Sequence, residues 1–139
     1  MFQPVYFVQS PKDVLIIFSG DQQVRPVYLD VPHSANPKPS WYGESVGYYE
    51  GDTLVVDTIG LNDQTFVGKL HVVERWKMVD DGKMLEVNFR VEDPETFNEP
   101  WLAMRRYRRV QQAMVEEVCA ENNQHLFDYR IPVANKPDF

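Results

Sequence analysis

Residues 45–59 read Ser-Val-Gly-Tyr-Tyr-Glu-Gly-Asp-Thr-Leu-Val-Val-Asp-Thr-Ile. Gly51-Asp52, with glycine first, suits a two-residue turn between antiparallel strands. The run 53–59 is rich in β-branched residues, which favour strands. Strand alternation places Asp57 on one face with Val55 and Ile59, and a carboxylate among apolar neighbours needs a hydrogen-bond partner or a catalytic role. This stretch therefore predicts a β-hairpin that carries an acid on an apolar face.

Similar apolar runs lie on both sides of this hairpin. Turn compositions separate them, such as Ser10–Asp13 and the Asp81-Gly82 pair. Short links between successive strands predict an antiparallel meander, which hides its edges by closing into a lipocalin-like β-barrel. The sequence predicts about eight strands, at 5–9, 14–18, 24–31, 46–49, 54–59, 70–79, 85–91 and 101–110.

The pattern changes after the eighth strand. Residues 111–123 contain no glycine or proline, and their apolar positions share a helical face, which predicts one C-terminal α-helix. Residues 132–139 are predicted to form an extended arm. The chain of 139 residues contains no repeat or interdomain linker, so residues 1–139 are interpreted as one domain.

Composition narrows the function classes. The net charge of −7 disfavours nucleic acid as a partner, because phosphates are repelled by an acidic surface. A single cysteine, Cys119, excludes an internal disulfide. No apolar run is long enough to predict a transmembrane helix, so no membrane partner is expected. The first residues lack a signal-peptide pattern, and the chain as given is predicted to be cytoplasmic.

Three acids lie on predicted core faces. Alternation puts Glu74 on one face of its strand with Val72 and Trp76, and Asp93 continues the apolar face of the strand at 85–91. Together with Asp57, they are predicted to point into one cavity. Desolvation there would raise their pKa values and suit them to general acid–base catalysis. The alternative is that each acid is held in a structural ion pair by an arginine, such as Arg25 or Arg105.

Other side chains complete this predicted active site. His71 and Tyr48 are candidates to donate a hydrogen bond to developing charge. Trp41 lies in the proline-rich loop 32–44 and is interpreted as a lid over a pocket. Core filling is the competing interpretation for the aromatic residues in strands. The predicted substrate-binding residues are Trp41, Trp76, Phe89 and Trp101.

The histidines leave one further alternative open. No pair has the spacing of an H-x-x-x-H or H-E-x-x-H motif, so the main interpretation includes no metal and no cofactor. A metal site that uses His33 or His71 with a neighbouring acid is nevertheless compatible with the ligand preferences of transition metals.

The central segment also resembles a known group of proteins. The run from Trp41 through Gly43, Ser45 and Gly47 into Glu50-Gly51-Asp52-Thr53-Leu54-Val55-Val56-Asp57-Thr58 is similar to a family of uncharacterised bacterial proteins. That family carries W-x-G-x-S-x-G-x-W-E-G-D-T-L-V-V-D-T. Further similar positions are Leu70-His71-Val72, Glu74-Arg75-Trp76, Asp93-Pro94, Pro100-Trp101 and residues 117–123.

This resemblance supports the positions of the site and brings no reaction with it. Family members are often longer and exported, which implies export for this protein if an N-terminal part is missing. Two departures stand out. Tyr49 replaces the second tryptophan of the motif, and the loop at 62–70 lacks a His-Ser-Glu element that is common in the family.

The favoured hypothesis is an enzyme that performs cofactor-free isomerisation, cyclisation or addition and elimination on a small apolar or aromatic molecule. Glu74, Asp57 or Asp93 would move the proton. One alternative is a non-catalytic carrier of lipocalin type. The other is a metal-dependent enzyme that uses His33 or His71. The sequence leaves open whether the protein forms a homodimer.

Overall fold

The computed structural model describes residues 4–20, 23–62 and 69–111, and these residues form one β-sheet with strands ordered as in the chain. All eight predicted strands are present. The helix predicted at 111–123 lies outside the described residues except for residue 111, and so does the arm at 132–139. The strands are β1 (Val5–Gln9), β2 (Asp13–Phe18), β3 (Gln23–Leu29), β4 (Glu44–Glu50), β5 (Thr53–Ile59), β6 (His71–Val79), β7 (Met84–Glu92) and β8 (Trp101–Arg108).

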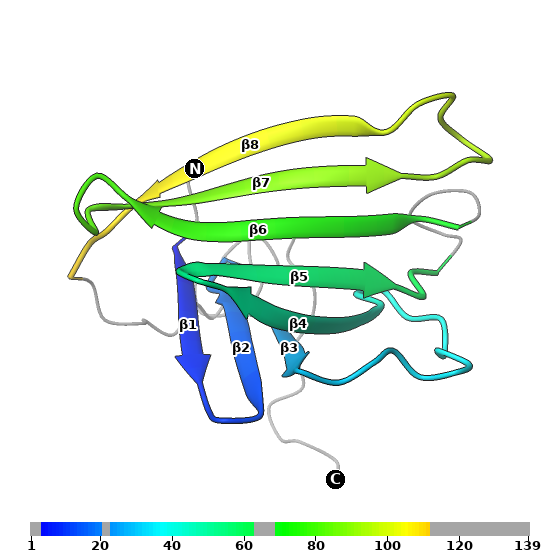
Figure 1. Cartoon of the computed structure of the whole chain (residues 1–139), viewed down its shortest axis with the longest axis horizontal. Coiled ribbons are helices and arrows are strands. Elements are labelled where there is room, and N and C mark those ends of the chain that lie inside the picture. Colours follow the sequence, from blue (N-terminus) through cyan, green and yellow to red (C-terminus); the bar gives the residue numbers. More distant parts are fainter. Residues whose placement is uncertain (1–3, 21–22, 63–68, 112–139) are drawn as a thin grey trace, which may run out of the picture.

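The sheet curls into a half-barrel (Figure 1). Strands β5–β8 run side by side, and β1–β3 cross their direction below them in this view. Strands β1 and β8 form the two edges and do not pair with each other among the described residues. The predicted closure into a full barrel is therefore replaced, in the part of the chain described, by an open and curved sheet.

One connection departs from the predicted antiparallel meander. Strand β3 pairs with β4 in parallel over Val27–Leu29 and Ser45–Gly47, whereas every other neighbouring pair is antiparallel. A parallel pair needs a long return connection, which the proline-rich loop 30–43 supplies. The loop is anchored at Ser40, whose N–H donates to Gly60 O at 3.0 Å and whose carbonyl accepts from Asn62 N at 2.8 Å.

The core lies on the inner, concave face of the sheet. Buried aliphatic side chains from β2, β3, β5 and β7 gather there around Trp76 of β6. The Trp76 ring meets Phe7 at 5.2 Å between centroids, Phe89 at 6.4 Å and Tyr107 at 6.1 Å, which ties both edges of the sheet to its middle. Full burial of an aliphatic side chain contributes about 1.5–3 kcal/mol. The fully buried aliphatic residues are Val14, Ile16, Val27, Val56 and Val87.

Within the described residues, no helix has the length and apolar character that crossing a membrane requires.

Candidate functional sites on two faces of the sheet

The strand register separates the predicted acids. Glu74 pairs with Val56 across β5 and β6, so both side chains point to the inner face. Asp57 pairs with Val73 and therefore points to the outer, convex face, as does His71 two residues earlier in β6. The prediction that Asp57, Glu74 and Asp93 share one cavity is wrong for Asp57. Its partner across the strands is Val73, which faces the opposite way from the adjacent Glu74. The prediction that His71 and Glu74 occupy opposite faces is confirmed.

Glu74 is buried on the inner face and is paired with Arg25 of β3. Only 3% of the Glu74 side chain is exposed, and its carboxylate contacts Arg25 Nη2 directly. Burial raises the pKa of Glu74, while the charge and the hydrogen bond of Arg25 act to lower it. The geometry matches the ion-pair alternative that the sequence left open for this acid.

Asp93 is buried at the end of β7 and organises the turn that follows. Its carboxylate accepts hydrogen bonds from Thr96 Oγ1 at 2.7 Å and from the Glu95 N–H at 3.1 Å. Its carbonyl accepts from the N–H groups of Thr96 and Phe97. The hydrogen bond from Thr96, followed by backbone donors, lowers the pKa of Asp93. These contacts suit a loop-fixing carboxylate.

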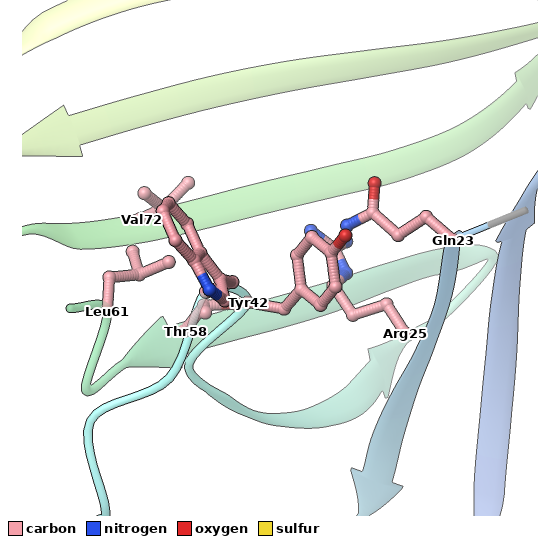
Figure 2. A pocket seen from close by; sticks show the side chains of 7 residues that line it. Gln23, Arg25, Tyr42, Thr58, Leu61 and Val72 are labelled. Atoms are coloured by element: carbon pink, nitrogen blue, oxygen red, sulfur yellow. The ribbon is translucent and has the colours of Figure 1, made fainter. Parts of the chain in front are cut away.

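A pocket opens on the inner face beside Arg25 (Figure 2). Its volume is about 110 Å³. Figure 2 shows the Tyr42 ring beside the Gln23 and Arg25 side chains, with Val72 and Leu61 on the other side of the hollow. This Arg25 pocket is lined by Gln23, Arg25, Trp41, Tyr42, Thr58, Leu61 and Val72.

The predicted substrate-binding aromatics divide among three environments. Trp41 lines the Arg25 pocket and is 56% exposed, as suits a residue over its mouth. Trp76 and Phe89 pack in the core cluster, which agrees with the core-filling alternative. Trp76 also lines a second hollow of about 250 Å³ on the inner face, next to Phe7 and Leu54. Trp101 begins β8 at the edge of the sheet and is 43% exposed. Of the four, only Trp41 is among the residues that line the Arg25 pocket.

The outer face carries a second constellation, built around Asp57. Its Oδ1 atom lies 3.0 Å from His33 Nε2 and 3.0 Å from His71 Nε2. His71 comes from the neighbouring strand β6, and His33 reaches over from the loop that follows β3. All three side chains are partly exposed, so solvent reaches them.

A carboxylate lies behind each imidazole ring. His33 Nδ1 is 3.2 Å from Glu44 Oε1, and His71 Nδ1 is 3.4 Å from Glu92 Oε2. Hydrogen bonds from the Ser34 hydroxyl and N–H lower the pKa of Glu44, and those from Arg90 lower the pKa of Glu92. Both acids are therefore held as carboxylates. The outer-face cluster consists of Glu44, His33, Asp57, His71 and Glu92.

Tyr48 also lies on the outer face, in β4, with its side chain partly exposed. A hydrogen bond to Glu50 raises the pKa of Tyr48.

Sequence reasoning missed Glu44, Glu92 and Tyr42. For Glu92 a signal existed, because alternation puts it on the outer face and the register sets it opposite His71. Glu44 and Tyr42 depend on the path of the loop 30–43, which alternation does not address.

Comparisons with known proteins add no identification. A scan of protein-family models, a search of curated proteins and a search of solved structures each return no match.

Proposed function

We propose that this protein binds a small aromatic or apolar molecule in the Arg25 pocket, as a non-catalytic binding protein of lipocalin type. The observation that carries the proposal is the pairing of an aromatic cover, Trp41 and Tyr42, with a polar floor at Arg25. Ligand pockets typically combine an apolar lining with a few placed polar groups. The curved sheet supports the pocket from beneath, and the loop 30–43 brings the cover.

The size of the pocket sets the size of the ligand. A volume of about 110 Å³ is somewhat below the roughly 150 Å³ of an apolar protein cavity that holds benzene. The pocket therefore suits a single ring or a short branched chain, with the rest of a larger molecule outside. Trp41 and Tyr42 supply flat surfaces against which such a ring stacks.

The polar floor favours a neutral hydrogen-bond acceptor. Arg25 Nη2 is committed to Glu74, so the pair as a whole carries no net charge. Arg25 Nε is buried and has no hydrogen-bond partner within the described part of the chain. A ligand carbonyl or hydroxyl oxygen placed there would satisfy it, and leaving a buried donor unsatisfied costs about 1–3 kcal/mol. The ligand class is thus an apolar or aromatic molecule with one oxygen acceptor.

Acid–base catalysis receives less support at this pocket. Its lining contains no carboxylate and no imidazole. Glu74 is tied to Arg25, and Asp93 is tied to its own turn. The second candidate function, cofactor-free proton transfer, would instead use Asp57 and His71, whose 3.0 Å contact is reachable from solvent. In that arrangement, however, both nitrogens of His71 already face carboxylates.

The test uses two probes of similar shape. Acetophenone carries a carbonyl acceptor and ethylbenzene does not, and binding of each is measured by ligand-observed NMR on the purified chain. The proposal predicts that acetophenone binds more tightly. Trp41→Ala should weaken binding about two- to tenfold, since an aromatic contact contributes about 0.5–1.5 kcal/mol. Trp101→Ala is the matched control, because Trp101 is a comparably exposed tryptophan outside the pocket.

Equal binding of the two probes would overturn the role of Arg25. Equal loss in both tryptophan variants, or no binding at all, would overturn the pocket assignment. Native mass spectrometry of freshly purified protein adds a separate check. A retained, unmodified apolar ligand supports a binding protein, whereas a ligand converted during incubation supports the catalytic candidate.

A further inference from the structure

We propose that His33, Asp57 and His71 form a binding site for a divalent first-row transition-metal ion on the outer face of the half-barrel. The proposal is separate from small-molecule binding in the Arg25 pocket, which lies on the opposite face of the sheet. Two imidazoles and one carboxylate are a ligand set that zinc, iron, cobalt and nickel accept.

The first argument is convergence. Two Nε2 atoms from a loop and a strand both reach a single oxygen of Asp57, each at 3.0 Å. Ligand atoms about 2.0–2.2 Å from a tetrahedral zinc ion lie about 3.3–3.5 Å from one another. Each ring nitrogen therefore has to move away from the carboxylate oxygen by about 0.3–0.5 Å to reach that spacing.

The second argument is the orientation of the rings. A histidine that binds a metal through one nitrogen usually donates its other N–H to a carboxylate or carbonyl, which fixes the ring. Glu44 stands at Nδ1 of His33, and Glu92 stands at Nδ1 of His71. Ser34 anchors Glu44, and Arg90 anchors Glu92, so the outer carboxylates are themselves held in place.

The third argument is a count of hydrogens. A neutral imidazole has one N–H, yet both nitrogens of both rings face carboxylate oxygens. Two neutral rings therefore leave two of these contacts without a hydrogen. A metal ion that accepts both Nε2 lone pairs removes the conflict, because each Nδ1–H is then free to donate to Glu44 or Glu92.

The net charge of the outer-face cluster also favours binding of a cation. Glu44, Asp57 and Glu92 contribute three negative charges, and Arg90, bonded to Glu92, contributes one positive charge. With neutral rings the cluster carries two net negative charges, which a divalent cation neutralises. Three protein ligands would leave one position of a tetrahedral ion open to solvent, as in catalytic rather than closed structural zinc sites.

In the arrangement found, no group of three or more His, Cys, Asp or Glu side chains in the described part of the chain is placed so that it could hold a metal ion, and the outer-face cluster has to rearrange first. In the cluster, Asp57 Oδ1 lies 3.0 Å from both ring nitrogens, so an ion enters only when the rings move away from this oxygen and turn their Nε2 lone pairs toward the ion.

The experiment uses the full chain without a histidine tag, freed of metal by a chelator. Zn²⁺ binding is measured by calorimetry, and Co²⁺ binding by the visible absorption of the bound ion. The expected result is one ion per chain. Asp57→Asn should weaken binding at least tenfold, and Glu92→Gln about tenfold to a hundredfold, the usual effect of losing an outer carboxylate. Asp52→Asn is the matched control, since Asp52 is an exposed carboxylate beside Lys77 in the same hairpin.

Absence of saturable Zn²⁺ binding would overturn the proposal. Binding that Asp57→Asn and Asp52→Asn retain equally would overturn it as well. His33→Gln guards against a folding defect in the Asp57 variant, because His33 lies in a loop and its replacement alters no strand. That variant too is expected to bind at least tenfold more weakly.

Discussion

Val56 and Asp57 are neighbours in β5, yet their surroundings share almost nothing. Val56 is fully buried in the core, whereas Asp57 is partly exposed between two imidazole rings. The only cause is the alternation of side chains along a strand. A polar residue such as Asp57 can therefore follow apolar residues in the sequence and still lie outside the core. Glu74 shows the opposite case, a charged residue that does enter the core and needs a partner there.

The Arg25–Glu74 pair should be costly to break. Arg25→Met leaves a buried carboxylate without its guanidinium, and losses of this kind are typically about 3–5 kcal/mol. We expect urea unfolding at neutral pH to show a decrease of that size. Arg106→Met is the control, because Arg106 pairs with Glu86 at 2.8 Å on the exposed face, where such pairs contribute below about 1 kcal/mol.

Replacing both partners tests whether the cost comes from the orphaned charge. The double variant Arg25→Met, Glu74→Leu should be more stable than Arg25→Met alone, because it removes the buried charge as well. Equal stability of Arg25→Met and Arg106→Met would show that Glu74 is not desolvated in solution.

Asp93 should make stability depend on pH in the acid range. Its pKa is lowered in the folded protein below the ordinary value of 3.8, so it stabilises the fold at pH values above 3.8. That contribution is lost as the pH falls through the folded-state pKa. The stability difference between the wild type and Asp93→Asn should therefore hold between pH 6 and about 4.5 and shrink as the pH is lowered below about 4. A difference that stays constant below about pH 4 would contradict the role given to the carboxylate.

At the scale of elements, the parallel pairing of β3 with β4 depends on Gly47. A Cβ at this position would lie 2.8 Å from Val27 Cγ1 and 2.8 Å from the carbonyl oxygen of Val55. Gly47→Ala should therefore destabilise the protein by about 1–3 kcal/mol, as overpacking in a core usually does. Thermal or urea unfolding measures the loss.

A double-mutant cycle identifies the cause. Val27→Ala removes the Cγ1 atom that the new methyl group would meet. The two changes together should cost less than the sum of their separate effects, because the second relieves part of the clash created by the first. Simple additivity would mean that the β3–β4 contact is looser than the structure shows.

The strands were predictable because β-branched residues, alternation and turn residues agree in each of them. β1 begins and ends where the sequence predicts, and the other strands differ by a few residues at their ends. The parallel connection was not predictable, because prolines in 32–44 indicate a loop and not its route. Closure of the sheet into a barrel also depends on contacts between the first and last strands, which the local sequence pattern does not predict.

At the scale of the whole molecule, the curved sheet separates two sites by its own thickness. The inner face presents the Arg25 pocket, and the outer face presents the cluster around Asp57. Both sites take a contribution from the same loop, since Trp41 and Tyr42 lie near its end and His33 near its start. The loop therefore positions the aromatic cover of the Arg25 pocket and one imidazole of the outer-face cluster.

The sequence indicated the residue types of both sites better than their grouping. Alternation placed Glu74 and His71 on opposite faces, as found. It could not show that Asp57 joins His71 rather than Glu74, because that depends on the register between β5 and β6. The partner of Glu74, Arg25, lies 49 residues away in the chain and becomes a neighbour only through the curl of the sheet.

The most direct test of a ligand pocket on the inner face compares two adjacent residues of β6. Val72 lines the Arg25 pocket, and Val73 pairs with Asp57 and points to the outer face. In protein with labelled valine and leucine methyl groups, titration with acetophenone should shift the NMR signals of Val72 and Leu61 and leave those of Val73 unchanged. A shift at Val73 with none at Val72, or no shift at any of the three, would contradict the account.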